Sequence, residues 1–315
     1  MKVLSIDGGG IRGLIPAVVL AEIERRSGRR IADLFDLIAG TSTGGILAAA
    51  LACPDGDGRP RFTAEELTDL YVTEGPRIFD NSLLRTVGSA GGLADERYDS
   101  DGLVAALETY VGRTRLSEAL VPVLLTAYDI EGRQAFFFRT ERARADPEYD
   151  FALADAALAT AAAPTYFEPV RVTDVAGAAT YPLVDGGVFA ANPAMCAWTD
   201  LIRAGVAPDV TVLASLGTGT AIRPIPYEQA RGWGLLGWAR PLIDVLFSGA
   251  SETVDFQLGQ ILGDRYMRFQ QRLEIASDDM DDASPENLRD LRAEGDLLVR
   301  ENTEAIDDLC ARLSE

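Results

Sequence analysis

The segment Gly40-Thr41-Ser42-Thr43-Gly44 has the GxSxG spacing of a nucleophile elbow. In such an elbow a serine sits on a tight turn between a strand and a helix, and flanking glycines permit that turn. The apolar run from Phe35 to Ala39 predicts the strand, and the Ala-rich run from Gly44 to Cys53 predicts the helix. This context indicates that Ser42 is a nucleophile for acyl transfer.

A serine nucleophile normally depends on a neighbouring base, and the usual base is imidazole. The 315 residues include no histidine, and Lys2 is the only lysine, so a carboxylate is the expected base. Asp185 follows the strand-like run Tyr181 to Val184 and precedes Gly186 and Gly187. Asp-Gly is also a common turn, but the lack of histidine favours Asp185 as the base. An aspartate with an ordinary pKa of about 4 accepts a serine proton poorly, so the reaction would rely heavily on stabilisation of the oxyanion.

A glycine-rich block, Asp7-Gly8-Gly9-Gly10-Ile11-Arg12-Gly13, lies between a predicted strand, Val3 to Asp7, and a predicted helix, Leu14 to Arg26. Successive N–H groups at a helix start favour an anion. Three of the glycines fit a GxGxxG dinucleotide loop, although no acidic residue is clearly placed after the next strand to bind ribose. A Walker A loop is excluded because no Lys-Ser or Lys-Thr pair follows. The third interpretation is an oxyanion hole, with Arg12 adding positive charge.

Strand-like and helical runs alternate along the chain, which predicts parallel β-α units around one largely parallel sheet. Further strands are expected at residues 122–127, 135–139, 181–184 and 210–216. The Ala-rich run 158–164, with the three residues after it, is expected to pack against the elbow. Asn192-Pro193 is expected to open a helix that supports the site.

Three other segments are interpreted from their composition. Residues 53–60 alternate Asp and Gly, but the ligand pattern of a calcium loop is incomplete, so a plain loop is expected. Residues 232–247 hold two tryptophans and several leucines, and are either a lipid-facing cap or a helix packed on the sheet. The acidic run 277–286 predicts a solvated connector before an amphipathic helix at 285–313.

The net charge of −20 argues against binding to nucleic acid and against electrostatic adhesion to an anionic bilayer. Three cysteines without metal-ligand spacing fit a reducing compartment. No run approaches the ~20 apolar residues of a membrane span, and the first apolar run, Val3 to Ile6, is too short for a signal peptide. A cytoplasmic protein is therefore expected.

Together these motifs resemble the patatin-like phospholipase family. Its hallmarks are a DGGGxRG block, a GxSxG elbow and a later DGG or DGA block, which correspond here to residues 7–13, 40–44 and 185–187. The segment Ser215-Leu216-Gly217-Thr218-Gly219 is similar to a strand-end segment of the same family. The resemblance extends from residue 3 to about residue 270.

The resemblance implies a three-layer α/β fold, with a mostly parallel central sheet and helices on both faces. Residues 1–275 would form the patatin-like domain, and residues 276–315 an acidic connector and C-terminal helix of the same globular unit. It also implies a Ser-Asp dyad in a phospholipase A or lysophospholipase that needs no cofactor or metal. The implied site residues are the catalytic Ser42 and Asp185, the oxyanion-hole residues Gly8, Gly9, Gly10 and Arg12, the elbow glycines Gly40 and Gly44, and the base-loop glycines Gly186 and Gly187.

The expected partner is a membrane phospholipid or lysophospholipid, reached by transient contact with the membrane surface. Two alternatives remain open. The first is the same hydrolase held inactive until a small nucleotide or a partner opens its lipid entrance, as in bacterial antiviral effectors of this family. The second is a non-catalytic lipid-binding or storage protein that keeps the scaffold.

Overall fold

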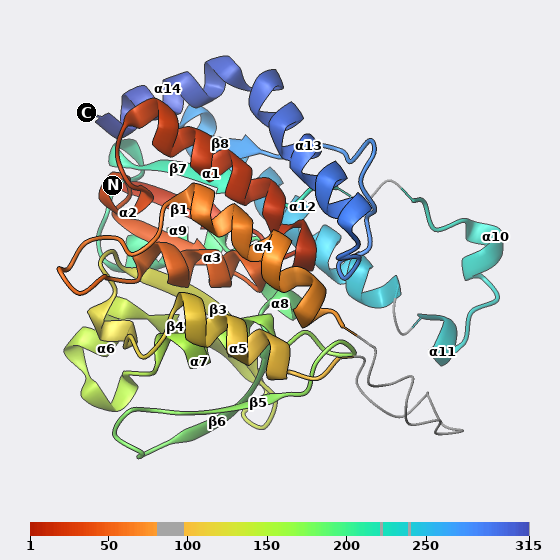
Figure 1. Ribbon diagram of the computed structural model, residues 1–315, viewed down its shortest axis with the longest axis horizontal. Helices are drawn as coiled ribbons and strands as arrows, with labels where there is room; N and C mark the ends of the chain where they lie inside the picture. The colour runs from red at the N-terminus through yellow and green to blue at the C-terminus, as the bar shows by residue number, and fades with distance from the viewer. Residues whose placement is uncertain (81–97, 221–222, 239–240, 315) are drawn as a thin grey trace.

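An eight-stranded sheet crosses the centre of the computed structural model, which describes residues 1–80, 98–220, 223–238 and 241–314 (Figure 1). The strands are β1 (Lys2–Ile6), β2 (Leu37–Gly40), β3 (Val123–Asp129), β4 (Gln134–Arg139), β5 (Val170–Thr173), β6 (Thr180–Asp185), β7 (Val212–Leu216) and β8 (Tyr266–Phe269). Their order is β5-β6-β3-β2-β1-β7-β8, with β4 paired to β3. Neighbours from β3 to β8 along this order are parallel, whereas β4, β5 and β6 pair antiparallel, which confirms a mostly parallel sheet.

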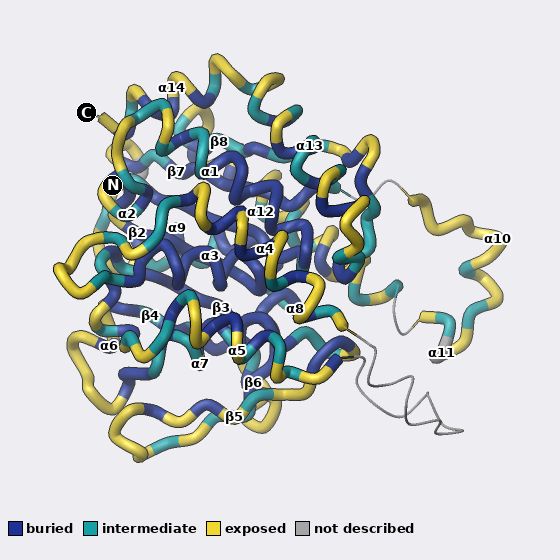
Figure 2. The backbone as a smooth tube through the Cα atoms, viewed as in Figure 1, coloured by how far each residue is buried: buried dark blue, intermediate teal, exposed yellow. Residues whose placement is uncertain are grey.

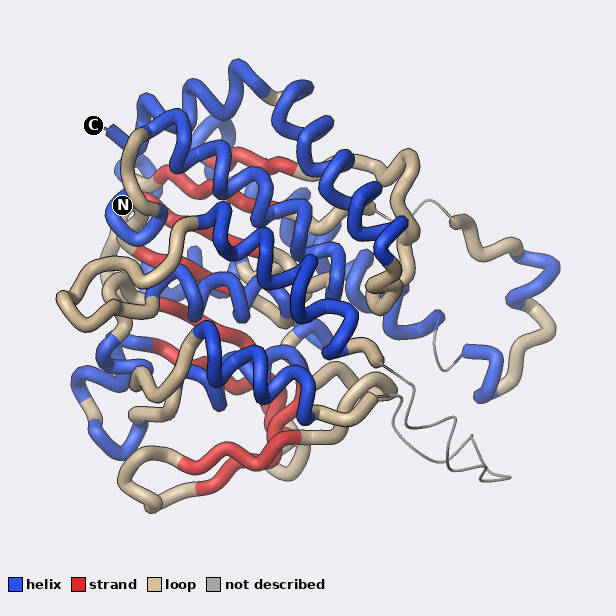
Figure 3. Tube along the Cα trace, in the orientation of Figure 1, coloured by secondary structure: helices blue, strands red, loops and turns tan. Residues whose placement is uncertain are grey.

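Helices occupy most of the connections between the strands (Figure 3). The α-helices are α1 (Leu14–Ser27), α2 (Ile31–Leu34), α3 (Thr43–Ala52), α4 (Ala64–Ile78), α5 (Asp101–Tyr110), α6 (Thr140–Ala145), α7 (Leu153–Ala161), α8 (Gly187–Ala190), α9 (Ala194–Arg203), α10 (Tyr227–Ala230), α11 (Leu235–Trp238), α12 (Pro241–Leu262), α13 (Pro285–Glu301) and α14 (Thr303–Ser314). Short 3₁₀ helices are η1 (Gly10–Gly13), η2 (Leu116–Glu118), η3 (Pro147–Tyr149), η4 (Pro208–Val210) and η5 (Gly263–Arg265).

The two faces of the sheet are covered by different helices, which confirms the three-layer α/β fold. Along β1, Leu4 and Ile6 point into a core shared with α1, α3 and α4, whereas Val3 packs on the opposite face with α9 and α12. This alternation follows from the two-residue period of a strand. Figure 2 shows that buried residues gather in the sheet and in the helix sides next to it, while the outer helix sides are exposed.

The predicted elements match the observed ones with a few corrections. The single helix expected at 285–313 is two helices, because α13 ends at Glu301 and α14 begins at Thr303. The side chain and the backbone N–H of Asn302 both donate to the Leu298 carbonyl oxygen. This oxygen at the end of α13 is therefore satisfied where the helix stops. Strands β5 and β8 were not predicted.

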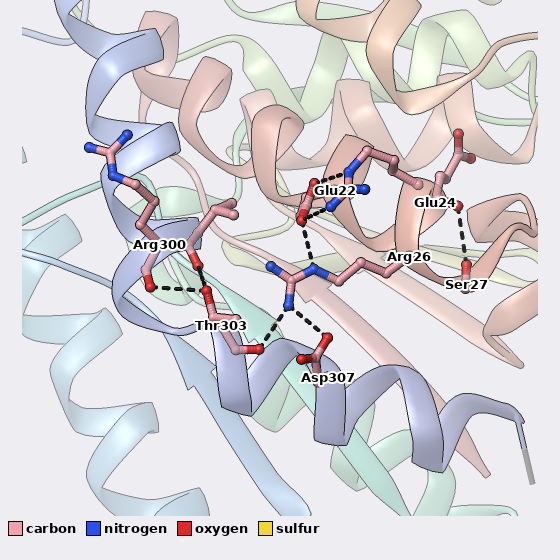
Figure 4. Close-up of polar contacts among 9 residues, drawn as sticks. Glu22, Glu24, Arg26, Ser27, Arg300, Thr303 and Asp307 are labelled. Carbon is pink, nitrogen blue, oxygen red and sulfur yellow. Dashed lines mark hydrogen bonds and ion pairs between the residues drawn. The ribbon is translucent and has the colours of Figure 1, made fainter.

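The C-terminal helices pack across α1 on one face of the molecule (Figure 1). Arg26 of α1 joins α1 to α14: its Nη1 donates to the Thr303 carbonyl and to Asp307 Oδ1, both at 2.8 Å (Figure 4). Its Nε also donates to Glu22 Oε1 on its own helix at 2.6 Å. The division of the chain at residue 275 remains a prediction.

Candidate active site

Ser42 sits at the sharp turn between β2 and α3, as the GxSxG spacing predicts. Its φ of 54° is in the left-handed region, which non-glycine residues rarely adopt and which is concentrated at functional sites. The turn leaves no room for side chains at its glycines: a Cβ on Gly40 would lie 2.3 Å from the Gly44 carbonyl oxygen, and one on Gly44 would lie 2.2 Å from that of Ile6. The elbow therefore requires glycine at both positions.

Hydrogen bonds of Thr41 and Ser42 to neighbouring segments stabilise this strained conformation. The Ser42 N–H donates to Thr160 Oγ1 of α7 at 3.0 Å. Beside it, Thr41 Oγ1 lies 2.7 Å from Thr126 Oγ1 and donates to the Ala190 carbonyl at 2.6 Å. The contact with Thr160 confirms the prediction that residues 158–164 pack against the elbow, although Thr160 itself could not be singled out from sequence.

Asp185 reaches the elbow because of the register between two antiparallel strands. In the sheet, Gly40 of β2 pairs with Leu125 of β3, and Asp185 of β6 pairs with Ala127 of β3. Ala127 lies two residues beyond Leu125, and Ser42 lies two residues beyond Gly40. The last residue of β6 therefore lies at the same height along the strands as the elbow. Asp185 is thus beside Ser42.

The Asp185 carboxyl is fully buried, and this burial raises its pKa to about 7. Hydrogen bonding from the Ser42 hydroxyl and from the Gly187 N–H lowers the pKa, but by less than burial raises it. The Gly187 N–H donates to Oδ1 at 2.6 Å. The Ser42 contact does not reach full hydrogen-bond geometry, so within the described part of the chain Asp185 Oδ2 has no complete hydrogen bond. Oδ2 is thus the oxygen available for a proton.

The glycine-rich block follows β1 and lies directly against Ser42, since a Cβ on Gly8 would be 3.2 Å from Ser42 Cβ. The structure corrects one predicted role in this block. The Gly8 N–H donates to the Ala191 carbonyl at 2.9 Å, so it is already occupied and cannot serve as an oxyanion donor. Gly8 instead provides space. The N–H groups of Gly9 and Gly10 have no acceptor among the described residues, and they remain candidate donors.

An ion pair that was not predicted fixes the start of this block. Asp7 is buried, and Arg268 Nη2 donates to its Oδ2 at 2.6 Å while Arg268 Nη1 donates to its Oδ1 at 3.0 Å. Ser251 Oγ donates to the same carboxylate at 2.9 Å. Burial raises the pKa of Asp7, and Arg268 opposes that rise. Arg268 was missed because it lies on β8, whose four residues show no clear strand pattern.

Two further polar contacts support the block. Thr218, from the segment Ser215 to Gly219, donates from Oγ1 to the Gly8 carbonyl at 2.9 Å. Asn192 Oδ1 accepts the Ala194 N–H at 3.0 Å and so begins α9, which confirms the prediction that Asn192-Pro193 opens a helix. The side chain of Asn192 also lies 3.4 Å from that of Ser5 on β1.

An apolar cavity of about 60 Å³ opens at Ser42 and extends between α3, α4, α5 and α7. Ile46, Leu70, Ile78 and Phe167 line it, together with Phe247 of α12. A narrow, apolar space that begins at a serine hydroxyl has the character of a site for a hydrocarbon chain.

Part of the segment 232–247 is buried and part is exposed, and residues 239 and 240 lie outside the described residues. Phe247 is 6% exposed and packs over the site: a Cβ on Gly187 would lie 2.0 Å from its ring. Leu242 and Leu246, earlier on α12, are 47% and 43% exposed. One part of the segment therefore belongs to the core and another part faces outward.

Among the residues that the structure describes, no group of three or more His, Cys, Asp or Glu side chains is arranged to hold a metal ion. Residues 53–60 form a turn in which Asp55 Oδ1 accepts the N–H groups of Asp57 and Arg59, as expected of a plain loop.

Comparisons with solved structures include two distant neighbours. VipD from Legionella pneumophila superposes with a TM-score of 0.43 at 12% identity, over 95% of this chain and 66% of that chain. The type III effector protein ExoU superposes with a TM-score of 0.40 at 13% identity, over 100% of this chain and 53% of that chain. This chain therefore spans less than two thirds of either solved chain.

The sequence comparisons find relatives that are much more similar to this chain than these two solved structures are. Patatin-like protein 2 of Arabidopsis thaliana is 36% identical over 95% of this chain and 83% of its own length. Patatin-04/09 of Solanum tuberosum is 33% identical over 95% of this chain and 84% of its own length. The family model for patatin-like phospholipase matches residues 4–198, a span that holds the elbow, the glycine-rich block and Asp185. This chain belongs to the patatin-like phospholipase family.

Proposed function

We propose that this protein hydrolyses fatty-acyl esters of membrane lipids through a dyad of Ser42 and Asp185. Membership of the family supports lipid acyl hydrolysis in general. The observation that carries the finer assignment is the buried Asp185 carboxyl, whose pKa of about 7 suits a general base near neutral pH, facing a strained serine in a chain without histidine.

In the proposed reaction, Ser42 Oγ attacks the ester carbonyl carbon and its proton passes to Asp185 Oδ2. The N–H groups of Gly9 and Gly10, near the N-terminus of α3, stabilise the oxyanion, each donor contributing about 3 kcal/mol. Collapse of the intermediate releases the alcohol, which takes the proton from Asp185, and leaves an acyl-Ser42 ester. Water then attacks this ester while Asp185 accepts its proton, and collapse of the second intermediate releases the fatty acid and Ser42 Oγ, which takes the proton back from Asp185.

The apolar cavity next to Ser42, about 60 Å³ in volume, would hold the part of the acyl chain nearest the ester during these steps. A non-catalytic lipid-binding protein would have no use for a carboxylate buried beside a strained serine, because both features reduce stability without helping to bind a hydrocarbon. The same two features therefore support the enzyme over the storage protein.

Contact with a membrane surface would use the outer side of α12. Leu242, Val245 and Leu246 are spaced three and four residues apart, and all are exposed, as are Trp238 and Tyr227 in the preceding helices. No helix of the described residues is long and apolar enough to cross a bilayer. With a net charge of −20, adhesion would depend on insertion of apolar side chains rather than on anionic lipid.

The dyad is tested by replacing each member in the purified protein. Ser42→Ala and Asp185→Asn should each reduce hydrolysis of p-nitrophenyl butyrate and of phospholipid by at least about 10³-fold, because each removes a group that acts in the transition state. Both variants should keep the circular dichroism spectrum of the wild type. A fluorophosphonate probe should label the wild type at Ser42. Wild-type rates in either folded variant would reject the dyad.

A further inference from the structure

The ring of Phe247, on α12, lies against both loops that carry the proposed catalytic groups. A Cβ on Gly8, in the glycine-rich block, would be 3.3 Å from the ring, and a Cβ on Gly187, in the loop after β6, would be only 2.0 Å from it. Gly187 is also the residue whose N–H donates to Asp185 Oδ1 at 2.6 Å. One aromatic side chain therefore packs on the glycine-rich block and on the loop that holds the proposed base.

A second contact fixes the position of α12. Ser251 lies four residues after Phe247, on the same side of the helix, and its Oγ donates to Asp7 Oδ2 at 2.9 Å. Asp7 is buried, directly precedes Gly8 and also pairs with Arg268 of β8. The helix is thus hydrogen-bonded to the residue that begins the glycine-rich block. This bond sets where the Phe247 ring lies.

The same ring lies between Asp185 and open space. Phe247 lines the apolar cavity at Ser42 and also a larger cavity of about 580 Å³. Within the described residues, Asp185 lines neither cavity, and its carboxyl is fully buried. Gly187 contacts both the ring and this carboxyl, and it has no side chain that could cover the carboxyl itself. The Phe247 ring is therefore placed to close the loop from Asp185 to Gly187 against water.

Exclusion of water is what sets the ionisation of Asp185. Burial is the largest cause of its raised pKa, and hydrogen bonds from the Ser42 hydroxyl and the Gly187 N–H oppose the rise. Among the described residues, no charged side chain of the surrounding elements contributes to this shift. The charged residues of those elements are Asp7 and Arg12 in the glycine-rich block, Asp129 on β3, Asp155 on α7, and Asp244, Glu252 and Asp255 on α12.

We propose that Phe247 is a positioning residue for the dyad, whose ring shields the Asp185 carboxyl from the water of the larger cavity. The inference rests on the proposed function, because it takes Asp185 as the base. A smaller side chain at position 247 would let water reach the carboxylate and stabilise its charged form. The carboxyl would then ionise at lower pH and would be a weaker base for the Ser42 proton.

The first test follows the pH dependence of hydrolysis as the ring is reduced. Phe247→Leu, Phe247→Val and Phe247→Ala remove increasing parts of it. The midpoint of the kcat/KM profile for p-nitrophenyl butyrate should fall in that order, by at least about 1 pH unit in the alanine variant. The plateau should fall at least about 3-fold, because the base is weaker. The leucine and valine variants give the same order if the alanine variant does not fold.

Phe256→Ala is the matched control, because Phe256 lies on the same helix, is 70% exposed and lines neither cavity. Its pH profile should equal that of the wild type. A lower rate at every pH in Phe247→Ala, with an unmoved midpoint, would mean that the ring only supports packing, and would overturn the inference. Equal shifts in the Phe247 and Phe256 variants would overturn it too, because they would report a general loosening of α12.

The second test needs no catalysis. In the wild-type background, Asp185→Asn should raise the urea midpoint of unfolding at pH 8, because it removes a buried charge. In the Phe247→Ala background this gain should fall to at most about half, because the charge is already hydrated. An undiminished gain would overturn the inference. A reduced gain, together with hydrolysis that does not depend on Asp185, would instead reject the proposed function and support the shielding.

Discussion

Burial gives Asp185 a pKa at which a carboxylate is a competent base near neutral pH. With an ordinary pKa of about 4, aspartate would be too weak a base, and the whole barrier reduction would fall to the oxyanion donors. At about 7, the carboxyl can take the Ser42 proton and return it to the leaving alcohol within one cycle. Under the proposed mechanism, the enclosed position of this one side chain would replace the function that imidazole has in histidine-dependent serine hydrolases.

The pH dependence of activity follows from the same value. The proposed base must be ionised, so kcat/KM for p-nitrophenyl butyrate should fall about tenfold for each pH unit below about 7 and reach a plateau above it. Initial rates measured from pH 5 to 9, corrected for spontaneous hydrolysis, give this profile. A rate that is constant between pH 5 and 8 would contradict Asp185 as the base.

The stability of the protein should depend on pH in the opposite sense. The pKa of Asp185 is about 4 in the unfolded chain and about 7 in the folded protein, so the folded state holds the proton more tightly. The stabilisation that the folded state gains by holding this proton is fully present below pH 4 and is lost as pH rises to about 7. The free energy of unfolding changes by up to ~4 kcal/mol over this range. Above pH 7 the buried charge destabilises the fold.

Asp185→Asn should therefore be more stable than the wild type at pH 8, because asparagine cannot ionise and its Oδ1 can still accept the Gly187 N–H. The advantage should shrink toward pH 5. Urea denaturation at the two pH values measures it. The same difference in unfolding free energy at both pH values would mean that ionisation of Asp185 does not destabilise the fold.

At the scale of elements, α12 has two different sides. Its inner side brings Phe247 over the site and Leu258 and Leu262 against the sheet, whereas Leu242 and Leu246 lie on its exposed side. An apolar exposed side on the helix that also contributes Phe247 to the cavity at Ser42 supports the proposed contact with a lipid surface.

The double variant Leu242→Ser/Leu246→Ser should weaken binding to phosphatidylcholine vesicles at least about 10-fold, because it removes apolar side chains that would insert between lipids. Neither residue lines the cavity at Ser42, so hydrolysis of p-nitrophenyl butyrate serves as the readout of an intact site. Ile202→Ser on α9, where Ile202 is 52% exposed, is the control. Vesicle sedimentation at low and high salt measures binding, and equal binding of all three proteins would contradict the assignment.

Elements with a strong local pattern could be predicted from the sequence, and short ones could not. β1 and β2 are mainly apolar runs with a glycine at the end of β2 and glycines shortly after β1, so their type and approximate ends are visible. β8 has four residues, with Arg268 in the third position, and only its pairing with β7 makes it a strand. The break at Asn302 also escaped prediction, because the apolar period continues on both sides of it.

The chemical groups of the candidate site were visible in the sequence, but their surroundings were not. Glycine spacing identifies the elbow, and the lack of histidine identifies Asp185. The contacts made by Thr160, Phe247 and Arg268 are long-range in sequence, and no local pattern marks them. The pKa of Asp185 and the occupied N–H of Gly8 depend on the same packing, so they follow only from the folded structure.

At the scale of the whole molecule, the C-terminal helices hold one wall of the site in place. Glu294 of α13 is fully buried, and its Oε1 accepts the backbone N–H groups of Glu274, Ile275 and Ala276. The chain after these residues leads to Met280, whose carbonyl accepts the Ile11 N–H in the glycine-rich block at 2.9 Å. The position of α13 is therefore coupled to the active-site loops.

Glu294→Ala should reduce the free energy of unfolding by about 3 kcal/mol or more, because several buried N–H donors lose their acceptor. Activity should fall as well, since the segment that carries Met280 loses its anchor. Glu301→Ala, an exposed position on the same helix, should change stability by less than about 0.5 kcal/mol. Urea denaturation of both variants checks the difference, and similar values for the two would exclude the anchor.

Phe247 and Met280 line the apolar cavity at Ser42 and also a second cavity of about 580 Å³, which Gly8 lines as well, and this arrangement has a further consequence for the order of events. If the alcohol product of the proposed mechanism leaves through the larger cavity, its departure admits the water needed for the second half-reaction. The carboxyl end of the fatty acid, in contrast, is formed beside a small apolar cavity, and the acid must return to the lipid surface to escape. Products would then depart in sequence, alcohol first, with release of the fatty acid as the slow step that a crowded membrane could retard.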